Sequence, residues 1–287
     1  MTRPPDPGSP VRFLPAGRVI AEMARVGRDR IHSTATWGVL TLGALGGGFI
    51  TAGALLSVLL ASGIGASGPR MLAQGFGFST GFFFVVLSEA ALFTEANVVM
   101  PATLMTGIAP AARVVRFWGL ALMGNLAGSV VLGSLIRLAH TYDPAVNALL
   151  AELITHKMAF RSIGGVGGWT SAVLSGVLAN WLVGMAAFFA TMGRTIVGRY
   201  IPVLLAVTTF VAAGFQHSPA NIGYFSLAMA AGGGPGWGPA ILWNLVPAGI
   251  GNVLGGTLLV ALPFWLLYGR KGASPESAGQ PGRWRPG

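Results

Sequence analysis

The chain consists of long apolar stretches separated by short polar ones. Six apolar segments are evident, at residues 36–63, 73–107, 112–138, 169–191, 199–231 and 238–268. A helix needs about 20 residues to cross the hydrocarbon core of a bilayer, so each segment can span a membrane. The ten-residue alternation that is typical of membrane β-strands is missing from the sequence. The pattern therefore predicts an all-α membrane protein with six transmembrane helices.

The second and fifth segments are longer than a span requires, and polar residues interrupt both. The second carries Thr94-Glu95-Ala96-Asn97, and the fifth carries Gln216-His217-Ser218-Pro219-Ala220-Asn221. A broken helix at bilayer depth is tolerated only where its backbone faces protein or a water-filled cavity. Because ionisable residues at that depth usually serve a function, we predict that the second and fifth helices are interrupted and that the interruptions line a path through the protein.

The two interruptions are similar to each other in sequence. Thr94–Asn97 and Ser218–Asn221 both read as a hydroxyl residue, any residue, Ala and Asn. A Gly-Asn-x-x-Gly motif follows each of them, at Gly124–Gly128 and Gly251–Gly255. This similarity predicts an internal repeat of three spans. Because an odd number of spans reverses the direction of the chain, the repeat is inverted, in a 3+3 arrangement.

The composition narrows the class of protein further. Hydrophobic residues make up 53% of the chain and charged residues 9%, against about 25% charged residues in soluble domains. These values exclude an ordinary soluble enzyme and a disordered chain. The net charge of +10 comes from segments that flank the spans, which argues against a nucleic-acid binder. The sequence has no cysteine, catalytic triad, phosphate loop or metal-ligand cluster, so we predict neither enzymatic activity nor a cofactor.

The positive charges predict an orientation. Fourteen of the 18 Lys and Arg residues lie near the two ends of the chain or in the loops after the second and fourth spans. The positive-inside rule then places both termini in the cytoplasm, in a multi-pass protein of the cytoplasmic (inner) membrane. We expect a basic N-terminal segment (1–35), a channel domain (36–268) and a disordered cytoplasmic tail (269–287). In the first of these, Val19–Ile31 alternates apolar and basic residues and could lie as a helix on the membrane surface.

The motifs around the interruptions resemble those of a known family. Phe210–Asn221 is similar to the second signature of the formate/nitrite transporter family, the FocA/NirC-like anion channels. Leu92-Phe93-Thr94 resembles the loop in that family's second span, Gly176–Trp181 its fourth span, and Gly251-Asn252 its sixth. The resemblance covers about residues 30–270 and implies an aquaporin-like fold and a homopentamer with one pore per subunit. It further implies passage of small monovalent anions or their conjugate acids, such as formate, nitrite, acetate or hydrosulfide.

The resemblance also implies positions in the pore. The centre of the pore would hold four polar residues, namely His217, Asn221, Gln216 and Thr94. Apolar constrictions would be formed by Phe78, Phe82, Leu92 and Phe210. A ring of apolar side chains blocks a hydrated ion and passes a neutral acid. We therefore expect the anion to become neutral in the apolar section, with a proton from either His217 or water.

Further residues would support the pore or the repeat. They are Phe93, Glu95, Asn97, Asn125 and Asn252. The alternative for the asparagines is hydrogen bonding between helices, and we assign that role to Asn180. Glu95 could cap the second half of the broken helix, carry a proton, or face a vestibule.

The chain departs from the family pattern at three positions. Gln216 and Ala91 stand where the family usually has acids, and the lysine that usually precedes the fourth span would fall near Gly164. Lys157 could replace that lysine from a mobile loop. The Leu-Phe-Thr-Glu loop with its Glu95 resembles the YfdC-like branch of the family. The departures leave two alternatives open: a pore for neutral solutes such as water, ammonia or an undissociated acid, and a non-conducting membrane scaffold or sensor.

Overall fold

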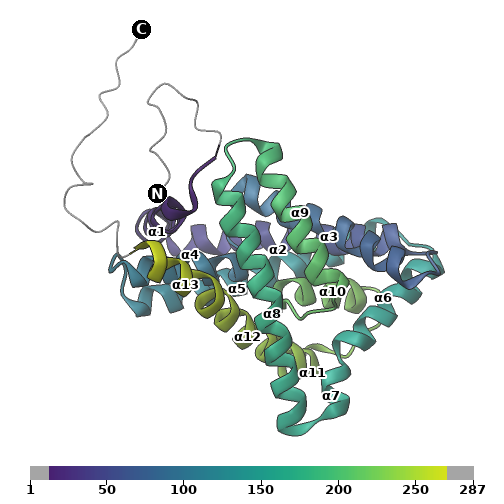
Figure 1. The fold of residues 1–287 in the computed structure, drawn as a ribbon. Coiled ribbons are helices and arrows are strands. Elements are labelled where there is room, and N and C mark those ends of the chain that lie inside the picture. The colour runs from purple at the N-terminus through teal and green to yellow at the C-terminus, as the bar shows by residue number, and fades with distance from the viewer. Residues whose placement is uncertain (1–12, 270–287) are drawn as a thin grey trace, which may run out of the picture.

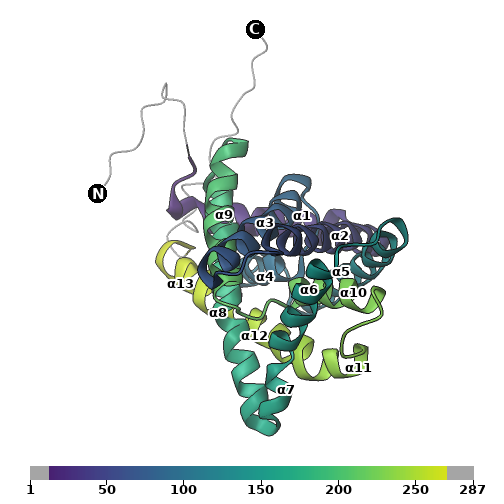
Figure 2. The ribbon, with the colours of Figure 1, turned by 90° about the vertical axis from the view of Figure 1, so that its right-hand side faces the viewer.

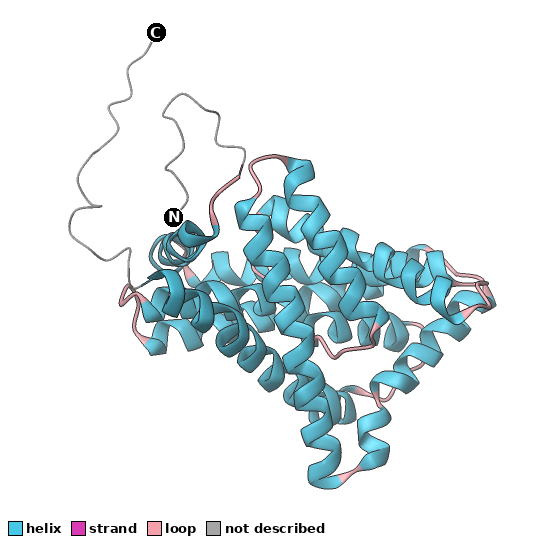
Figure 3. Ribbon diagram, viewed as in Figure 1, coloured by secondary structure: helices cyan, strands magenta, loops and turns pink. Residues whose placement is uncertain are grey.

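All regular elements that the structure describes are helices (Figure 3). The computed structural model describes residues 13–269, and no strand is assigned within that range. The predicted disordered tail and the first part of the basic N-terminal segment fall on residues 270–287 and 1–12, which lie outside the described residues. The all-α fold class that the sequence predicts is confirmed.

The helices form two corresponding sets (Figure 1). The first set contains α2 (Thr36–Ala61), α3 (Ser67–Ser88), α4 (Phe93–Met105) and α5 (Ala111–Ala139). The second set contains α8 (Gly165–Met192), α9 (Ile196–Ala212), α10 (Ser218–Ala230) and a final segment. That segment comprises α11 (Trp237–Ala240), η1 (Ile241–Leu245), α12 (Val246–Gly256), η2 (Thr257–Ala261), α13 (Leu262–Phe264) and η3 (Trp265–Gly269), where η marks a π-helical turn.

The lengths of the helices agree with the predicted spans. Five continuous helical segments of the described chain are long and apolar enough to cross a membrane, namely α2, α3, α5, α8 and the final segment. The remaining predicted span is divided between α9 and α10, and each of these is shorter than a bilayer requires. The six-span arrangement is consistent with this division.

Both predicted interruptions are present. Residues 89–92 separate α3 from α4, and residues 213–217 separate α9 from α10. Glu89 ends α3 in the left-handed region, with φ of 56°, a conformation that is costly for a residue with a Cβ atom. Gly214 adopts a φ of 71° after α9, where glycine avoids that cost. Each long apolar segment is therefore two half-helices joined by a short extended stretch.

The two sets of helices pack in the same manner. Helix α2 lies against α5 and α8 lies against α12, while α3 and α9 contact each other. The last glycine of each Gly-Asn-x-x-Gly motif stands where these pairs meet. A Cβ atom on Gly128 would collide with the carbonyl of Ala44, and one on Gly255 would collide with that of Val177. Small residues allow helix backbones to approach closely, which explains why both motifs end in glycine.

Helix α1 (Ala16–Ser33) precedes the first span and lies against α4 (Figure 1). It contains the helix predicted over Val19–Ile31. Its apolar residues Val19, Ile20 and Met23 are buried in the protein. The predicted helix is therefore present, and its apolar face is buried against α4.

Helices α6 (Pro144–Lys157) and α7 (Ala159–Ile163) connect the two sets on the side opposite α1 (Figures 1 and 2). Asp143 accepts a hydrogen bond from the N–H of Ala145 and so caps the start of α6. An ion pair between Arg70 and Glu152, at 3.1 Å, joins α6 to the start of α3. Helix α6 contacts α10, and its last residue, Lys157, lies beside the interruption of the fifth span.

Candidate functional site

The first broken helix is held by an asparagine of the neighbouring span. Asn125 on α5 accepts a hydrogen bond from the N–H of Phe93 at its Oδ1 atom, at 3.0 Å. Its Nδ2 atom donates to the carbonyl of Ala91 at 2.9 Å and to that of Gly43 on α2 at 2.9 Å. The side chain thus binds the backbone on both sides of Leu92 and satisfies groups that the break leaves without helical partners.

The second broken helix is held in the same way. Asn252 on α12 accepts a hydrogen bond from the N–H of Ser218 at 2.9 Å. Its Nδ2 atom donates to the carbonyl of Gln216 at 3.0 Å and to that of Gly176 on α8 at 2.8 Å. Each asparagine therefore makes the same three backbone contacts in its own half. This correspondence is direct structural support for the predicted inverted repeat.

The hydrogen bonds also correct the register of the repeat. Phe93 and Ser218 are the residues that donate to the two asparagines, so they are equivalent positions. The sequence comparison instead paired Thr94 with Ser218, which is wrong by one residue. The sequence alignment of the two interruptions matches their shared Ala and Asn residues. The structural alignment instead follows the backbone groups that bind Asn125 and Asn252. In the corrected register Leu92 is equivalent to His217.

We expect replacement of Asn252 by alanine to destabilise the protein strongly. The change leaves one buried N–H and two buried carbonyls without this partner, and each unsatisfied buried group costs about 1–3 kcal/mol. The measurement is the thermal unfolding midpoint of the purified protein in detergent. Asn147→Ala is the matched control, because Asn147 is exposed on α6. Equal midpoints for the two variants would contradict the role given to Asn252.

A buried pair of polar side chains lies between the two breaks. Thr94 Oγ1 and His217 Nε2 are 2.7 Å apart, and both residues are fully buried. The Nδ1 atom of His217 accepts a hydrogen bond from the N–H of Ala220 at 3.2 Å and so caps α10. In the neutral ring this places the remaining hydrogen on Nε2, where it is donated to Thr94. The structure thus brings together two of the four residues predicted at the pore centre.

An apolar cluster of side chains lies beside this pair. Phe210 lies 5.2 Å from His217 between ring centroids, and Phe78 meets Phe210 edge-to-face at 5.8 Å. Phe78, Phe82, Leu92 and Phe210 are all buried in one apolar cluster. The four residues predicted at the constrictions therefore belong to one continuous apolar region around the Thr94–His217 pair.

A basic side chain, Lys157 at the end of α6, lies near the Thr94–His217 pair. The Nζ atom of Lys157 donates to Asn221 Oδ1 at 2.6 Å and lies 4.7 Å from the centroid of the Tyr224 ring. The Tyr224 ring stacks on Phe78 at 5.9 Å, and its hydroxyl donates to Ser57 at 2.9 Å. Lys157 forms no ion pair with any Asp or Glu among residues 13–269. No carboxylate of these residues therefore balances a positive charge on this amino group, and its neighbours Asn221 and Tyr224 are uncharged.

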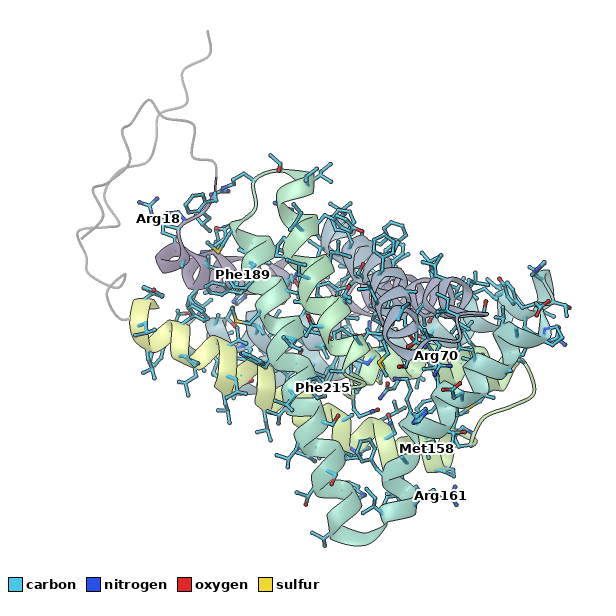
Figure 4. All side chains as sticks on the ribbon, turned by 45° about the vertical axis from the view of Figure 1, so that its right-hand side comes forward. Arg18, Arg70, Met158, Arg161, Phe189 and Phe215 are labelled. Atoms are coloured by element: carbon cyan, nitrogen blue, oxygen red, sulfur yellow. The ribbon has the colours of Figure 1, made fainter. Side chains whose placement is uncertain are left out.

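The side chains of Gln216 and Asn221, also predicted at the pore centre, bind each other and not the imidazole of His217. Asn221 Nδ2 donates to Gln216 Oε1 at 2.9 Å and to Asn244 Oδ1 at 2.6 Å. Asn244 in turn donates to Gln216 Oε1 at 2.9 Å and to the carbonyl of Lys157 at 2.7 Å. Phe215 and Met158, the chain neighbours of Gln216 and Lys157, are labelled in Figure 4 and mark the two segments that meet here.

The expectation about the missing lysine needs correction. The sequence places no lysine near Gly164, and the structure shows Gly164 in a turn between α7 and α8. Lys157, the alternative from the preceding loop, reaches the network from the end of α6. Lys157 therefore stands earlier in the chain than the family's lysine. The short helix α7 lies between Lys157 and the fourth span and accounts for this difference.

Glu95 is bound by the N-terminal helix. Arg30 Nη1 on α1 donates to Glu95 Oε2 at 2.8 Å, and the two side chains are only 15% and 16% exposed. Glu95 makes no capping hydrogen bond at the start of α4. It lines a cavity of about 590 Å³ between α1 and the broken end of α3. Of the alternatives for Glu95, the position facing a vestibule agrees with the structure, and Arg30 balances its charge.

The same vestibule carries further charged groups. Its lining includes Glu22, Arg25, Glu89 and Arg199. Arg25 donates two hydrogen bonds to the carboxylate of Glu22, which holds the pKa of that carboxyl below its usual value. The vestibule is therefore lined by charges of both signs, in contrast to the apolar region around His217.

Asn97 and Asn180 lie between α4, α8 and α12, apart from the Lys157 network. Asn180 donates to the carbonyls of Asn252 at 2.6 Å and Thr94 at 3.3 Å, which agrees with the role between helices that we assigned to it. The Asn97 side chain is fully buried and makes no hydrogen bond to another described residue. Phe93 is buried and contributes its backbone N–H to Asn125.

Four residues of the site were missed or underweighted by sequence reasoning. Tyr224 stands three positions after Asn221 on the same helix, and this spacing was a usable signal, because residues three apart share a face. Asn244, Lys157 and Arg30 lie on three other segments. Nothing local in the sequence connects these three residues to the interruptions.

Comparisons with known proteins agree with this geometry. The family model described as "Formate/nitrite transporter" matches residues 17–266. A "Probable formate transporter" of Methanothermobacter thermautotrophicus is 29% identical over 243 residues, which cover 80% of this chain and 88% of the relative. The "Formate channel FocA" of Escherichia coli (strain K12) is 29% identical over 285 residues, which cover 90% and 95%.

A solved structure shares the fold. The structure described as a "Pentameric formate channel with formate bound" has a TM-score of 0.68 to this chain at 22% sequence identity. The match covers 82% of this chain and 98% of that chain. The helical arrangement with two broken spans is therefore the arrangement of a known channel fold.

Proposed function

The chain belongs to the formate/nitrite transporter family, and from this premise we propose that it is a transmembrane channel or transporter for small monovalent anions or their conjugate acids. The substrate class comprises formate, nitrite, acetate and hydrosulfide. Two relatives are described as formate transporters or channels, and a protein of the same fold is described with formate bound.

The main support for this proposal is the buried Thr94–His217 pair and the apolar side chains next to it. Phe78, Leu92 and Phe210 enclose the pair on the path between the two breaks. A narrow apolar section excludes hydrated ions by dewetting. A passing anion must therefore lose water at the point where His217 offers its Nε2–H. We infer that this hydrogen bond lowers the cost of dehydration there.

Lys157 gives the path a preference for negative charge. Its amino group lies outside the apolar section, next to Asn221, and faces no carboxylate partner among the described residues. An anion that reaches Lys157 is attracted by this charge and then meets the constriction. The conjugate acid carries no charge and crosses the apolar section at lower cost. We therefore expect uptake to rise as the external pH falls.

We propose a homopentamer with a separate pore in each subunit. The pentameric description of the protein of the same fold supports this assembly. The excess of Lys and Arg on the side of α1 supports a cytoplasmic position for both termini, in the inner membrane. We assign no enzymatic role, because in the Thr94–His217 pair the Nε2 atom of His217 donates to the hydroxyl of Thr94 and is not placed to take its proton.

The test is solute uptake into liposomes that contain the purified protein. Formate, nitrite and hydrosulfide influx would be followed at several external pH values, beside empty liposomes. The proposal predicts selective uptake above the control that increases as the pH falls. Permeability to water or ammonia without anion uptake would favour a pore for neutral solutes. Permeability to none of these solutes would favour a non-conducting scaffold.

We expect Gln216→Glu to reduce anion uptake at neutral pH and to change the ratio of formate to nitrite uptake. The new carboxylate would lie beside Asn221 and Asn244 and would offset the charge of Lys157. A smaller effect at acidic pH is expected, because a protonated carboxyl carries no charge. The measurement is the ratio of initial uptake rates in liposomes. Rates and ratios equal to those of the unchanged protein would contradict a position for this side chain on the path.

A further inference from the structure

A basic pocket lies on the side of α1, apart from the Thr94–His217 pair. It is formed where the end of α1 meets the starts of α2 and α5, and its volume is about 340 Å³. Its polar lining residues are Arg30, His32, Thr34, Thr36, Arg113 and Arg116. Apolar side chains, among them Val39 and Leu120, form the remainder of the wall. None of the functions proposed above uses this pocket.

The pocket holds positive charge without an acidic partner. Arg30 is engaged by Glu95, but Arg113 donates to His32 Nδ1 at 3.0 Å and Arg116 donates to the hydroxyl of Thr36. No carboxylate of the described residues lines the pocket. Arg113 donates to Nδ1 of His32, so in the tautomer that fits this contact the ring hydrogen lies on Nε2 and can be donated to a ligand. Two guanidinium charges thus remain for an external anion.

The backbone adds to the attraction for an anion. Helix α2 begins at Thr36, and no side chain caps its first turn. The free N–H groups and the positive end of the helix dipole at such a start favour a bound anion. Arginine forks match the oxygens of a phosphate group, which accepts two parallel hydrogen bonds. The combination of two arginines and a helix start therefore fits a phosphate group.

The position of the pocket indicates where that phosphate comes from. Trp37 follows Thr36 directly and is 73% exposed, and tryptophan is enriched at the level of the lipid headgroups. The pocket lies at the start of two membrane-spanning helices, α2 and α5. Basic pockets of this kind between transmembrane helices bind anionic lipid headgroups.

We propose that this pocket binds the phosphate group of an anionic phospholipid, of the phosphatidylglycerol or cardiolipin class. Arg113 and Arg116 contact the phosphate oxygens, the start of α2 faces them, and the acyl chains extend along the apolar faces of α2 and α5. The bound lipid joins α1 to the first and third spans. A free phosphate ion shares the headgroup chemistry but lacks the apolar part.

The test is the thermal stability of the full chain in detergent with added lipid. The lipid titrated is phosphatidylglycerol, and phosphatidylcholine and inorganic phosphate are titrated separately. The Arg113→Gln/Arg116→Gln variant is compared with the matched control Arg137→Gln/Arg161→Gln, which removes the same charge on the side of α6 and α7. A ligand that binds the folded state raises the unfolding midpoint, and the rise grows with the logarithm of the ligand concentration relative to its Kd.

We expect phosphatidylglycerol to stabilise the unchanged protein and the control variant more than phosphatidylcholine does. The Arg113/Arg116 variant should need at least about tenfold more phosphatidylglycerol for the same shift, because each arginine near an anionic headgroup contributes severalfold to the affinity. Lysines at both positions should restore part of the binding.

Three results would overturn the proposal. They are equal stabilisation by the two lipids, equal titration of the Arg113/Arg116 variant and the control, and stabilisation by inorganic phosphate that matches that by phosphatidylglycerol. The last result would assign the pocket to free phosphate instead of lipid. Since no transport is measured, failure here leaves the proposed channel function unaffected.

Discussion

Formate uptake falls at least about tenfold when His217 is replaced by asparagine. Asparagine can still accept the N–H of Ala220 and cap α10, so the start of the half-helix keeps its support. The change removes the Nε2–H that meets Thr94 at 2.7 Å inside the apolar surround. A hydrogen bond to a charged group contributes about 1.5–3 kcal/mol, and about 1.4 kcal/mol on a barrier is a factor of ten in rate. The measurement is the initial rate of formate influx into liposomes at fixed pH.

Two further variants separate transport from folding. His217→Phe keeps a ring of similar size in the same position, and we expect it to assemble normally and to abolish uptake. His140→Asn changes an exposed histidine and should leave the rate unchanged. Assembly is checked by the elution volume of the purified oligomer. Normal influx through His217→Asn would remove the histidine from the transport path, whatever the other variants show.

The second large effect is expected from Lys157→Met, which keeps the length of the side chain and removes its charge. We expect anion uptake below neutral pH to fall roughly 10- to 100-fold, because opposite charges near a protein surface attract by a few kcal/mol. Helix α6 lies outside the membrane-spanning helices, and burial lowers the pKa of Lys157 to about 7. The amino group is therefore charged below that pH and neutral above it.

The sign of the pH effect follows from this pKa. In the unchanged protein, attraction of the anion grows as the pH falls through about 7, in addition to protonation of the anion itself. Lys157→Met should lose the first contribution and keep the second, so that its pH profile follows only the acid fraction of the solute. Arg161→Gln, an exposed charge on α7 (Figure 4), is the matched control. If Lys157→Met retained the rate and the pH profile of the control, the lysine would have no part in attracting the anion.

The sequence was sufficient to predict the spans, the two interruptions and the repeat. These features depend on local patterns, because each polar break lies inside an otherwise apolar segment and each glycine motif lies inside one span. The buried pair of Thr94 and His217 was predicted for the same reason, since both residues belong to the breaks. The register of the repeat was wrong by one residue because it is set by backbone hydrogen bonds to Asn125 and Asn252, which leave no trace in side-chain identity.

The sequence could not decide which groups of the site are contacted from distant segments, although it offered Lys157 as a candidate. Lys157 ends a helix between two spans, and only the packing of α6 on α10 brings it to Asn221. Arg30 reaches Glu95 because α1 folds back against α4. In both cases a long-range contact decides which charge meets which group. A single sequence contains several equally suitable charges for each position and gives no means of choosing among them.

The equivalence of Leu92 and His217 bears on how such a protein can evolve. Asn125 and Asn252 bind the backbone on either side of these two residues, and Asn252 Oδ1 also accepts from the hydroxyl of Ser218. These contacts of the asparagines do not depend on the side chain between those atoms, and at His217 that side chain adds a cap on α10. After a gene duplication, one copy could acquire an imidazole while the other retained an aliphatic group, without loss of the fold. The same two positions offer a designer places to change the chemistry of the channel on an unchanged scaffold.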